Sequence, residues 1–374
     1  MLCLKWNTFM RIVSTSYSKT EEYSDPQNWL KRISFYTGIL EELTKQHKVY
    51  SIERINYKGK YQQNGVDYYF IQLTNKVIRF PWKMHRLIKK LQPDVVLVNG
   101  FIFPLQIIQL RLTLGKQVKI IVLHRAEKPF SHFKKWLQAL ADKCVEAYLF
   151  TAAEFGKEWA ERGIIRNQNK IHEVIQSSSF FRPESKQAAR SKLGIDGAPI
   201  YLWVGRLEKN KDPLTVVKAF IRFHSVHSGA RLYMIYQTNE LLEEVKALIN
   251  TNNQISEAIR LVGKVPHDAL QSWYSGADFI VSGSHYEGSG IAVSEAMSCG
   301  CIPVVTDIIS FRKMADTCGL FYKPGDENAL VNVLEHTLAL DIEKERKKVL
   351  DEFQKELSFA AIAKKINHII TEIT

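Results

Sequence analysis

The sequence predicts an α/β protein made of two doubly wound, parallel-sheet, Rossmann-like domains that face a cleft. Three observations lead to this fold class. The chain has 374 residues, enough for about two domains. It contains short, continuous apolar runs bounded by turn residues, and stretches of helical apolar spacing separate those runs. Such apolar runs are typical of parallel strands that helices cover on both faces.

The first half of the chain alternates predicted strands and helices. Strands are expected at 11–17, 48–55, 66–73, 93–100, 118–124 and 147–151. Helical spacing predicts a helix over 28–46, a basic helix over 84–91 and a helix through Trp136 and Ala141. The residues before Met10 lack the apolar core and cleavage site of a signal peptide, so the start is expected at either Met1 or Met10.

The second half repeats this alternation after an interruption. The segment 183–198 is polar and charged, and it is predicted to be a linker. Strands are then expected at 199–205, 231–236, 259–262, 279–282 and 302–306, with helices at 214–224, 241–250, 267–275 and 290–298. Ligands of doubly wound sheets bind outside the carboxyl ends of the strands, so the crevice between the two domains is the expected site.

Composition narrows the class of protein further. An apolar share of 45% and a charged share of 24% exclude a mainly disordered chain. No apolar run reaches the ~18 residues of a membrane-spanning helix. Five cysteines in a chain of this length do not form a disulfide framework. We therefore expect a reducing compartment and a cytoplasmic protein.

The positive charge is concentrated in the first half. Residues 1–200 carry 32 basic and 17 acidic side chains, a net charge of +15, whereas residues 201–374 carry a net charge of −3. One interpretation is an anionic partner, such as nucleic acid, a membrane face or a charged acceptor. The other is a generally basic proteome without a special partner.

A glycine-rich turn lies in the segment 284–300, SHYEGSGIAVSEAMSCG. Gly288 and Gly290 stand where a predicted strand passes into a helix, an arrangement that directs free N–H groups at a phosphate. A plain βα turn has the same composition. Glu287 in the loop and Glu295 in the helix could address two parts of one ligand. Glu295 has apolar or small neighbours, which is unusual for a solvated carboxylate.

Three further side chains follow predicted strands. Arg206 comes directly after the strand at 199–205, and Lys211 stands five residues later. Two cations at the carboxyl end of a strand suit a diphosphate, although an ordinary basic surface loop has the same composition. His124 ends a buried strand of the first half and is expected to face the crevice. A lone histidine is more often structural.

These residues together resemble the retaining nucleotide-sugar glycosyltransferases of the GT-B fold, glycosyltransferase family 4 (glycosyl transferases group 1). The resemblance is closest over 200–324. It rests on Gly-Arg-Leu followed by Lys in 205–211, on two Glu with seven residues between them in 287–295, and on the turns at 299–306 and 319–326. The sequence departs from the family at three places. Ser289 stands where the family often has Phe, and Asp212 stands where it has Gly. The loop 17–25 lacks a Gly-Gly pair.

The resemblance implies a role for each candidate residue. Arg206 and Lys211 would hold the donor diphosphate, Glu295 the ribose hydroxyls and Glu287 the donor sugar, while His124 would approach the reacting carbon. The remaining donor-binding positions would be Gly205, Val265 in the loop beside the base, and the phosphate-cradling backbone of Gly288, Ser289, Gly290 and Ile291.

The resemblance also implies a domain plan. Residues 1–182 would form an N-terminal acceptor-binding domain, 183–198 a linker, and 199–354 a C-terminal nucleotide-sugar-binding domain. The last segment, 355–374, would be a helix that returns to the N-terminal domain.

The implied function is transfer of a hexosyl or N-acetylhexosaminyl group from a UDP- or GDP-sugar to a lipid-linked or polysaccharide acceptor. Retention of configuration, independence of metals and other cofactors, and a place in cell-envelope polysaccharide biosynthesis are part of that implication. A same-face displacement is the working mechanism. A sugar-nucleotide epimerase or a phosphorylase on the same fold is the alternative enzyme, and a basic membrane- or nucleic-acid-binding protein is the alternative that is not an enzyme.

Two stretches, 79–90 and 128–136, interleave Lys and Arg with Trp and Phe. This pattern favours peripheral contact of the N-terminal domain with an anionic membrane at the inner face. The alternative is a pair of solvated helix faces with buried aromatic side chains. Nucleic-acid binding is not expected, because zinc ligands, an RNP-like strand and a recognition-helix motif are all missing from the sequence.

Overall fold

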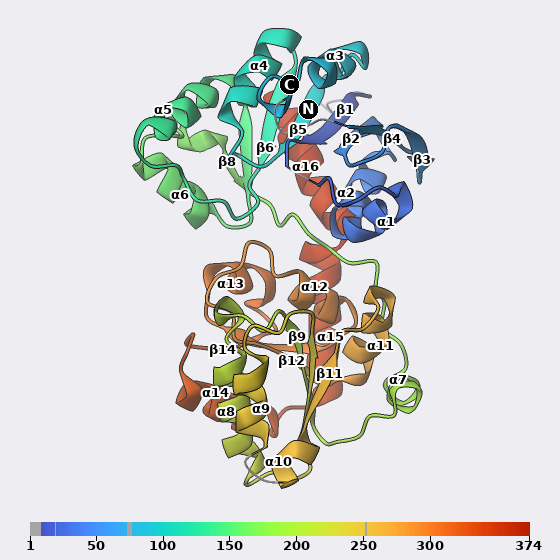
Figure 1. Ribbon diagram of the computed structural model, residues 1–374, viewed down its shortest axis with the longest axis vertical. Coiled ribbons are helices and arrows are strands. Elements are labelled where there is room, and N and C mark those ends of the chain that lie inside the picture. The colour runs from blue at the N-terminus through green and yellow to red at the C-terminus, as the bar shows by residue number, and fades with distance from the viewer. Residues whose placement is uncertain (1–8, 19, 73–76, 251–252) are drawn as a thin grey trace, which may run out of the picture. The chain divides into compact units, whose positions relative to one another are not determined.

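The computed structural model describes residues 9–18, 20–72, 77–250 and 253–374 (Figure 1). Most of the segment before Met10, and Leu73 at the predicted end of a strand, lie outside the described residues. The chain divides into two compact units, which are residues 1–177 with 359–374 (unit 1) and residues 178–358 (unit 2). Each unit contains a parallel sheet with helices on its faces, so the predicted fold class is confirmed.

Unit 1 has an eight-stranded sheet in the order β3-β4-β2-β1-β5-β6-β7-β8. Every neighbouring pair is parallel except β3 with β4. The inner strands are almost fully buried because helices cover both faces. The strands are β1 (Arg11–Ser16), β2 (Lys48–Arg54), β3 (Gly59–Gln63), β4 (Val66–Ile71), β5 (Val95–Asn99), β6 (Lys119–Leu123), β7 (Ala147–Phe150) and β8 (Ile171–Glu173).

The helices of unit 1 depart from the expected pattern in two respects: those at Pro104–Leu114 and Ala153–Glu161 were not predicted, and one predicted helix is divided. The helix predicted over 28–46 is two helices, because Ile33 leaves the helical backbone region (φ −101°, ψ 18°). Unit 1 also receives the last helix, which packs on the second of these two helices. The helices are α1 (Pro26–Arg32), α2 (Ser34–Leu43), α3 (Trp82–Lys90), α4 (Pro104–Leu114), α5 (His132–Ala141), α6 (Ala153–Glu161) and α16 (Phe359–Ile373).

Unit 2 has a six-stranded parallel sheet in the order β11-β10-β9-β12-β13-β14. Its strands are β9 (Ile200–Gly205), β10 (Arg231–Tyr236), β11 (Ile259–Gly263), β12 (Phe279–Ser282), β13 (Ile302–Thr306) and β14 (Leu320–Tyr322). Its helices are α7 (Lys186–Leu193), α8 (Pro213–His224), α9 (Leu242–Ile249), α10 (Asn253–Ala258), α11 (Leu270–Gly276), α12 (Ile291–Ser298), α13 (Ile309–Ala315), α14 (Glu327–Thr337) and α15 (Ile342–Glu352). A π-helical turn at Phe353–Leu357 follows α15.

The segment 183–198, predicted as a linker, instead carries α7 and is part of unit 2. Its charges have a structural use, since Lys186 Nζ and Arg190 Nη2 bind the buried carboxylate of Asp278 at 2.9 and 2.8 Å. Polar composition here therefore reflects ion pairing inside the unit. The division of the chain falls earlier, between residues 177 and 178, and unit 2 continues to 358.

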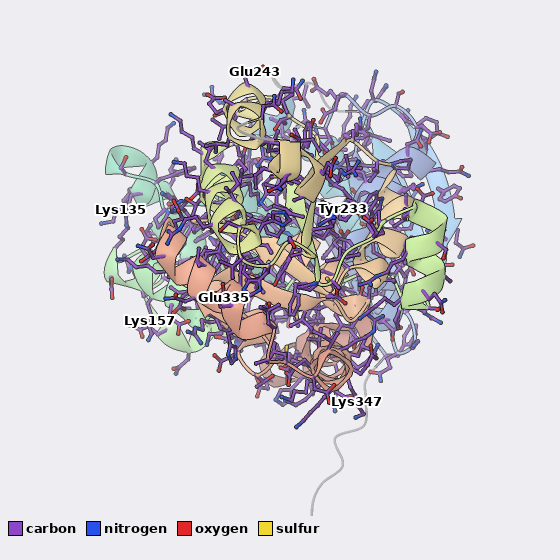
Figure 2. All side chains as sticks on the ribbon, turned by 90° about the horizontal axis from the view of Figure 1, so that it is seen from below. Lys135, Lys157, Tyr233, Glu243, Glu335 and Lys347 are labelled. Carbon is purple, nitrogen blue, oxygen red and sulfur yellow. The ribbon has the colours of Figure 1, made fainter. Side chains whose placement is uncertain are left out.

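Charged side chains project from the surfaces of both units. Lys135 on α5 and Lys157 on α6 project from unit 1, while Glu243 on α9 and Glu335 on α14 project from unit 2 (Figure 2). Tyr233 on β10 is by contrast only 5% exposed.

The strand order positions the sites in both units. In unit 1 the first strand, β1, lies between β2 and β5, and in unit 2 the first strand, β9, lies between β10 and β12. At such a switch point the connecting helices leave on opposite faces of the sheet, so the loops diverge and leave room for a ligand at the carboxyl ends. The predicted donor residues follow β9 and β12.

Candidate functional site

Two loops of unit 2 run together outside the carboxyl ends of β9 and β12. Residues 206–212 follow β9, and residues 283–290 follow β12. His285 N donates to Asn210 O at 2.9 Å, and Asn210 Nδ2 donates to Tyr286 O at 3.0 Å. His285 Nε2 also lies 3.1 Å from Asp212 Oδ2. These contacts bring the two predicted donor-binding segments into one surface.

Gly283 makes this close approach possible. A Cβ atom at this position would lie 2.8 Å from Asp212 O and 3.0 Å from Lys211 O, both of them backbone atoms. Asp212 itself has left-handed backbone geometry (φ 42°), and its carboxylate caps α8 by accepting from Thr215 N at 3.2 Å. Aspartate is among the few residues that tolerate this conformation, which accounts for Asp212 at the position where the resemblance has glycine.

Lys211 and Glu287, both predicted to bind the donor, form an ion pair with each other. Glu287 Oε1 also accepts a hydrogen bond from Ser284 Oγ at 2.7 Å. The side chains of Lys211 and Glu287 are 21% and 15% exposed. A mostly buried cation held by one carboxylate can exchange part of that contact for an incoming phosphate, because charge-assisted hydrogen bonds to phosphate are comparably strong.

Arg206 lies apart from this ion pair. Its guanidinium is 59% exposed and contacts the neighbouring Glu208 at 3.0 Å. The structure therefore brings Lys211 and Glu287 together but leaves Arg206 on the surface of the same loop. Gly205, directly before it, ends β9, where a Cβ atom would lie 3.1 Å from the Trp203 ring.

The N-terminal end of α12 is the last part of the candidate donor site. Gly290 precedes the helix with a left-handed backbone (φ 49°), and a Cβ atom there would lie 2.8 Å from the Phe311 ring. Gly290 has no side chain with which to cap this helix end. Gly288, Ser289 and Ile291 around it are half-buried. Helix N-termini carry partial positive charge, so this end favours an anion.

Glu295 is 5% exposed and lies on α12. Its Oε1 accepts from His267 Nε2 at 2.6 Å, and its Oε2 accepts from the Tyr274 hydroxyl at 3.2 Å. Burial, followed by the charge of Glu295, raises the pKa of Tyr274 well above its usual value, so the phenol remains a donor. The Phe181 ring lies against the His267 ring in a tilted arrangement, with 5.0 Å between the ring centroids.

These partners of Glu295 were not recognised from the sequence. His267 belongs to the loop predicted to lie beside the base, while Tyr274 has the spacing of an ordinary core residue and gave no signal. Ser284 stands out in the sequence only as part of the glycine-rich segment. Val265 is half-buried and packs against the apolar core of unit 2.

His124 lies in unit 1 within an aromatic cluster, 5% exposed. Its ring is 4.6 Å from Phe150 and 5.8 Å from Trp159, and Nε2 donates to Glu127 O at 2.7 Å. Burial lowers the pKa of His124 despite the nearby Glu127 carboxylate, so the neutral form is favoured. The ring is thus enclosed rather than open at the strand end, and its role toward a sugar stays a prediction.

Over the described residues, no three His, Cys, Asp or Glu side chains are grouped so that they could hold a metal ion. Within the same residues, no helix has the length and apolar character needed to span a membrane.

Comparison with known proteins agrees with this geometry. Residues 185–355 match the family model "Glycosyl transferases group 1". A D-inositol 3-phosphate glycosyltransferase of Acidothermus cellulolyticus is 32% identical over 143 residues, covering 34% of this chain and 30% of that protein. The chain thus matches only about a third of the length of its first curated relatives.

Solved structures match over nearly the whole chain. A glycosyltransferase from Rickettsia africae superposes with a TM-score of 0.73 and 16% identity, covering 98% of each chain. HepE of Anabaena, in complex with UDP and glucose, has a TM-score of 0.69 and 12% identity, covering 97% of this chain and all of that one. The chain therefore has the fold of GT-B glycosyltransferases, and its residues 185–355 match the glycosyl transferases group 1 family.

Proposed function

We propose that this protein is a glycosyltransferase that takes a sugar from a nucleotide-diphosphate sugar bound to unit 2. The observation that carries the proposal is the pairing of the loops 206–212 and 283–290. Together they present Lys211, Glu287 and the N-terminal end of α12 at one edge of the sheet. The residues at this edge belong to the segment 185–355, which matches the group 1 family. The UDP held by the structurally similar HepE supports a UDP- or GDP-sugar as the donor.

Each candidate residue then has a task. Lys211 and Arg206 bind the diphosphate, and the backbone between Gly288 and Ile291 cradles it. Glu295, oriented by His267 and Tyr274, accepts the ribose hydroxyls. Glu287 takes hydroxyls of the donor sugar. The donor also contacts Gly205, Val265, Ser289 and Gly290, and His124 of unit 1 is assigned to the sugar near its reacting carbon.

The proposed reaction breaks the bond between the anomeric carbon and the diphosphate oxygen, and the electron pair leaves with the diphosphate. The acceptor hydroxyl oxygen forms the new bond on the same face, and its proton passes to the departing phosphate. Lys211 and Arg206 stabilise the negative charge that develops there, which is where fixed cations contribute most to rate. Retention and independence of metals belong to this proposal.

The acceptor is proposed to be lipid-linked or a polysaccharide of the cell envelope, reached at the inner membrane face. Support comes from the surface of unit 1. Phe80 and Trp82, at the start of α3, are 52% and 50% exposed, and Val77 is 42% exposed. Arg79, Lys83, Arg86, Lys89 and Lys90 are exposed beside them. We call these eight residues the basic-aromatic face. Exposed aromatic side chains among cations suit an anionic membrane surface.

Thermal unfolding with UDP, GDP and their sugars tests the donor site. A ligand that binds the native state raises the unfolding temperature by mass action. We expect either UDP and its sugars or GDP and its sugars to stabilise the wild type, and Glu295→Gln to weaken the binding of that nucleotide about tenfold or more.

Arg206→Ala should reduce turnover strongly while changing the free energy of unfolding by less than about 0.5 kcal/mol, because the side chain is largely exposed.

Glu335→Gln is the matched control, since Glu335 is an exposed carboxylate on α14 of the same unit. Product analysis with labelled donor distinguishes transfer from epimerisation and phosphorolysis. Wild-type turnover in both Glu295→Gln and Arg206→Ala would refute the assignment.

A further inference from the structure

The ion pair between Lys211 and Glu287 is flanked by a two-way contact of the same two loops. Asn210 precedes Lys211, and His285 and Tyr286 precede Glu287. The carbonyl oxygen of Asn210 accepts from His285 N at 2.9 Å, and its side-chain Nδ2 donates to Tyr286 O at 3.0 Å. Asn210 therefore binds the backbone of the loop 283–290 through both its main chain and its side chain, directly beside the ion pair.

His285 and Asp212 join the loops on the other side of Lys211. His285 Nε2 donates to Asp212 Oδ2 at 3.1 Å, while Asp212 Oδ1 accepts from Thr215 N at 3.2 Å and caps α8. Each carboxylate oxygen of Asp212 thus has its own donor. A Cβ atom at Gly325 would lie 3.4 Å from His285 Cε1, so the imidazole also lies beside the turn that follows β14.

Side chains of two neighbouring strands anchor the rest of the segment 282–287. The Tyr322 hydroxyl, on β14, donates to Ser282 O at 3.0 Å, and Thr306 Oγ1, on β13, donates to Ser284 O at 2.5 Å. Both donors are buried residues. The carbonyl oxygen of Tyr286 is bound by the loop 206–212. Alternate carbonyl oxygens of the segment therefore each have a side-chain donor from another element, and the loop 206–212 is positioned against this anchored support.

We propose that His285 is a positioning residue of the donor site, which acts through Asp212 to hold Lys211 where the donor diphosphate binds. The proposal rests on the proposed transferase function, in which Lys211 binds that diphosphate. Asp212 stands where the resemblance has glycine, so the contact uses a carboxylate that the resemblance does not supply.

The physical reason is preorganisation. Lys211 must exchange part of its contact with Glu287 for the phosphate, and the His285 contact keeps the two loops together during this exchange. Ligand binding then costs less loop entropy, because the backbone beside the ammonium group is already fixed. A cation held in place also stabilises the charge of the departing diphosphate better than one that must be reoriented.

The test compares two ligands of the full chain, only one of which reaches Lys211. Uridine and guanosine contact Glu295 and the loop beside the base, whereas UDP and GDP also bring a diphosphate to Lys211. Calorimetric titration measures the Kd of each diphosphate, and ligand-observed NMR that of each nucleoside. We expect His285→Ala to raise the Kd of the bound diphosphate about tenfold and to change that of its nucleoside by less than about twofold.

Two further variants separate positioning from a general structural role. His285→Gln should recover most of the lost affinity, since its amide can still donate to Asp212. Asp212→Gly keeps the left-handed backbone but removes the carboxylate. Adding His285→Ala to Asp212→Gly should not raise the Kd of UDP or GDP further, because both changes remove the same contact.

His227→Ala is the control, since His227 forms another histidine–carboxylate pair of unit 2, with Glu335 at 2.7 Å, outside the two loops. It should keep the wild-type Kd values. Thermal unfolding of His285→Ala should match the wild type closely, because partly exposed pairs contribute little to stability.

Three results would overturn the positioning role: an unchanged Kd of UDP or GDP in His285→Ala, an equal loss for nucleoside and diphosphate, or additive losses in the double variant. If the wild type binds UDP or GDP in these cases, the transferase assignment stands. If the wild type binds neither nucleoside nor diphosphate, both proposals fail.

Discussion

His85 is a fully buried histidine on α3, and only one of its ring nitrogens has a partner in the described chain. Nε2 lies 2.9 Å from the Tyr17 hydroxyl, while Nδ1 has no hydrogen-bond partner among the described residues. Burial lowers the pKa of His85 from its usual 6.5 to about 4. The folded state therefore holds the neutral ring in a pH range where the unfolded chain would protonate it.

This pKa makes the stability of unit 1 sensitive to acid. Between pH 6.5 and 4 the unfolded state binds the extra proton, so the stabilisation from neutral His85 is complete above about 6.5 and is lost as pH falls toward 4. The loss should reach about 3 kcal/mol. Chemical unfolding at a series of pH values should show a shallower decline for His85→Gln than for the wild type.

His368→Gln serves as the control, since His368 is an exposed histidine of α16. An equal pH dependence in wild type and His85→Gln would contradict the assignment of the decline to His85.

The proximity of single residues in the candidate site was predictable where the chain signals them locally. Lys211 and Glu287 both follow strands, and parallel strands end at the same sheet edge, so their proximity follows from the strand pattern. Tyr274 was not predictable, because its bond to Glu295 joins two helices whose packing no local spacing reveals. Burial of His124 under Phe150 and Trp159 depends in the same way on tertiary contacts.

At the scale of elements, the pairing of the loops 206–212 and 283–290 depends on Gly283, which has no side chain. Gly283→Ala would put a Cβ atom 2.8 Å from the carbonyl oxygen of Asp212. Because backbone atoms cannot rotate away, one loop must move. We expect unit 2 to lose about 1–3 kcal/mol of stability and nucleotide affinity to fall, as calorimetric unfolding and titration would show.

Gly276→Ala is the comparison variant. Its Cβ would lie 3.3 Å from the end of the Ile195 side chain, which can rotate, and 3.6 Å from Ala189 Cβ and Arg190 Cγ, which is ordinary van der Waals contact. We expect this variant to keep wild-type nucleotide affinity. If Gly283→Ala also kept that affinity, the close approach of the loops would not matter for the site.

Elements were predictable when a continuous apolar run or a long amphipathic spacing marked them. The edge strands β3, β8 and β14 were not predicted, because they are short or alternate with exposed residues, as in GKYQQ of β3. The helix α7 was missed because charged residues dominate its sequence. Those charges reflect ion pairs with Asp278, which become visible only once the sheet is formed.

At the scale of the whole molecule, the charge asymmetry follows the two units. Unit 1 carries 30 basic and 16 acidic side chains, and unit 2 carries 21 and 23. The aromatic side chains of the basic-aromatic face, Phe80 and Trp82, are exposed, which disfavours the alternative of buried aromatics on an ordinary solvated helix. A surface of this kind gains about 1 kcal/mol per Lys or Arg near an anionic membrane.

Vesicle sedimentation tests this surface. The full chain should bind vesicles containing phosphatidylglycerol, with binding that weakens as salt rises because screening shortens the range of the attraction. Replacing Phe80 and Trp82 together by serine should reduce binding severalfold. Val226→Ser, which alters a 73% exposed apolar side chain of unit 2, should not. Equal binding to neutral and anionic vesicles would contradict the membrane proposal.

Unit 1 is assembled from two stretches of chain that are separated by the whole of unit 2. Its final helix, α16, packs on α2, and Asn367 Oδ1 lies 2.7 Å from His47 Nε2. A ribosome produces this helix only after residues 178–358, so unit 2 can complete its sheet while α2 still lacks its cover. During synthesis the order of maturation is therefore the reverse of the order of sequence: unit 2 is finished first, and unit 1, which is begun first, is closed last.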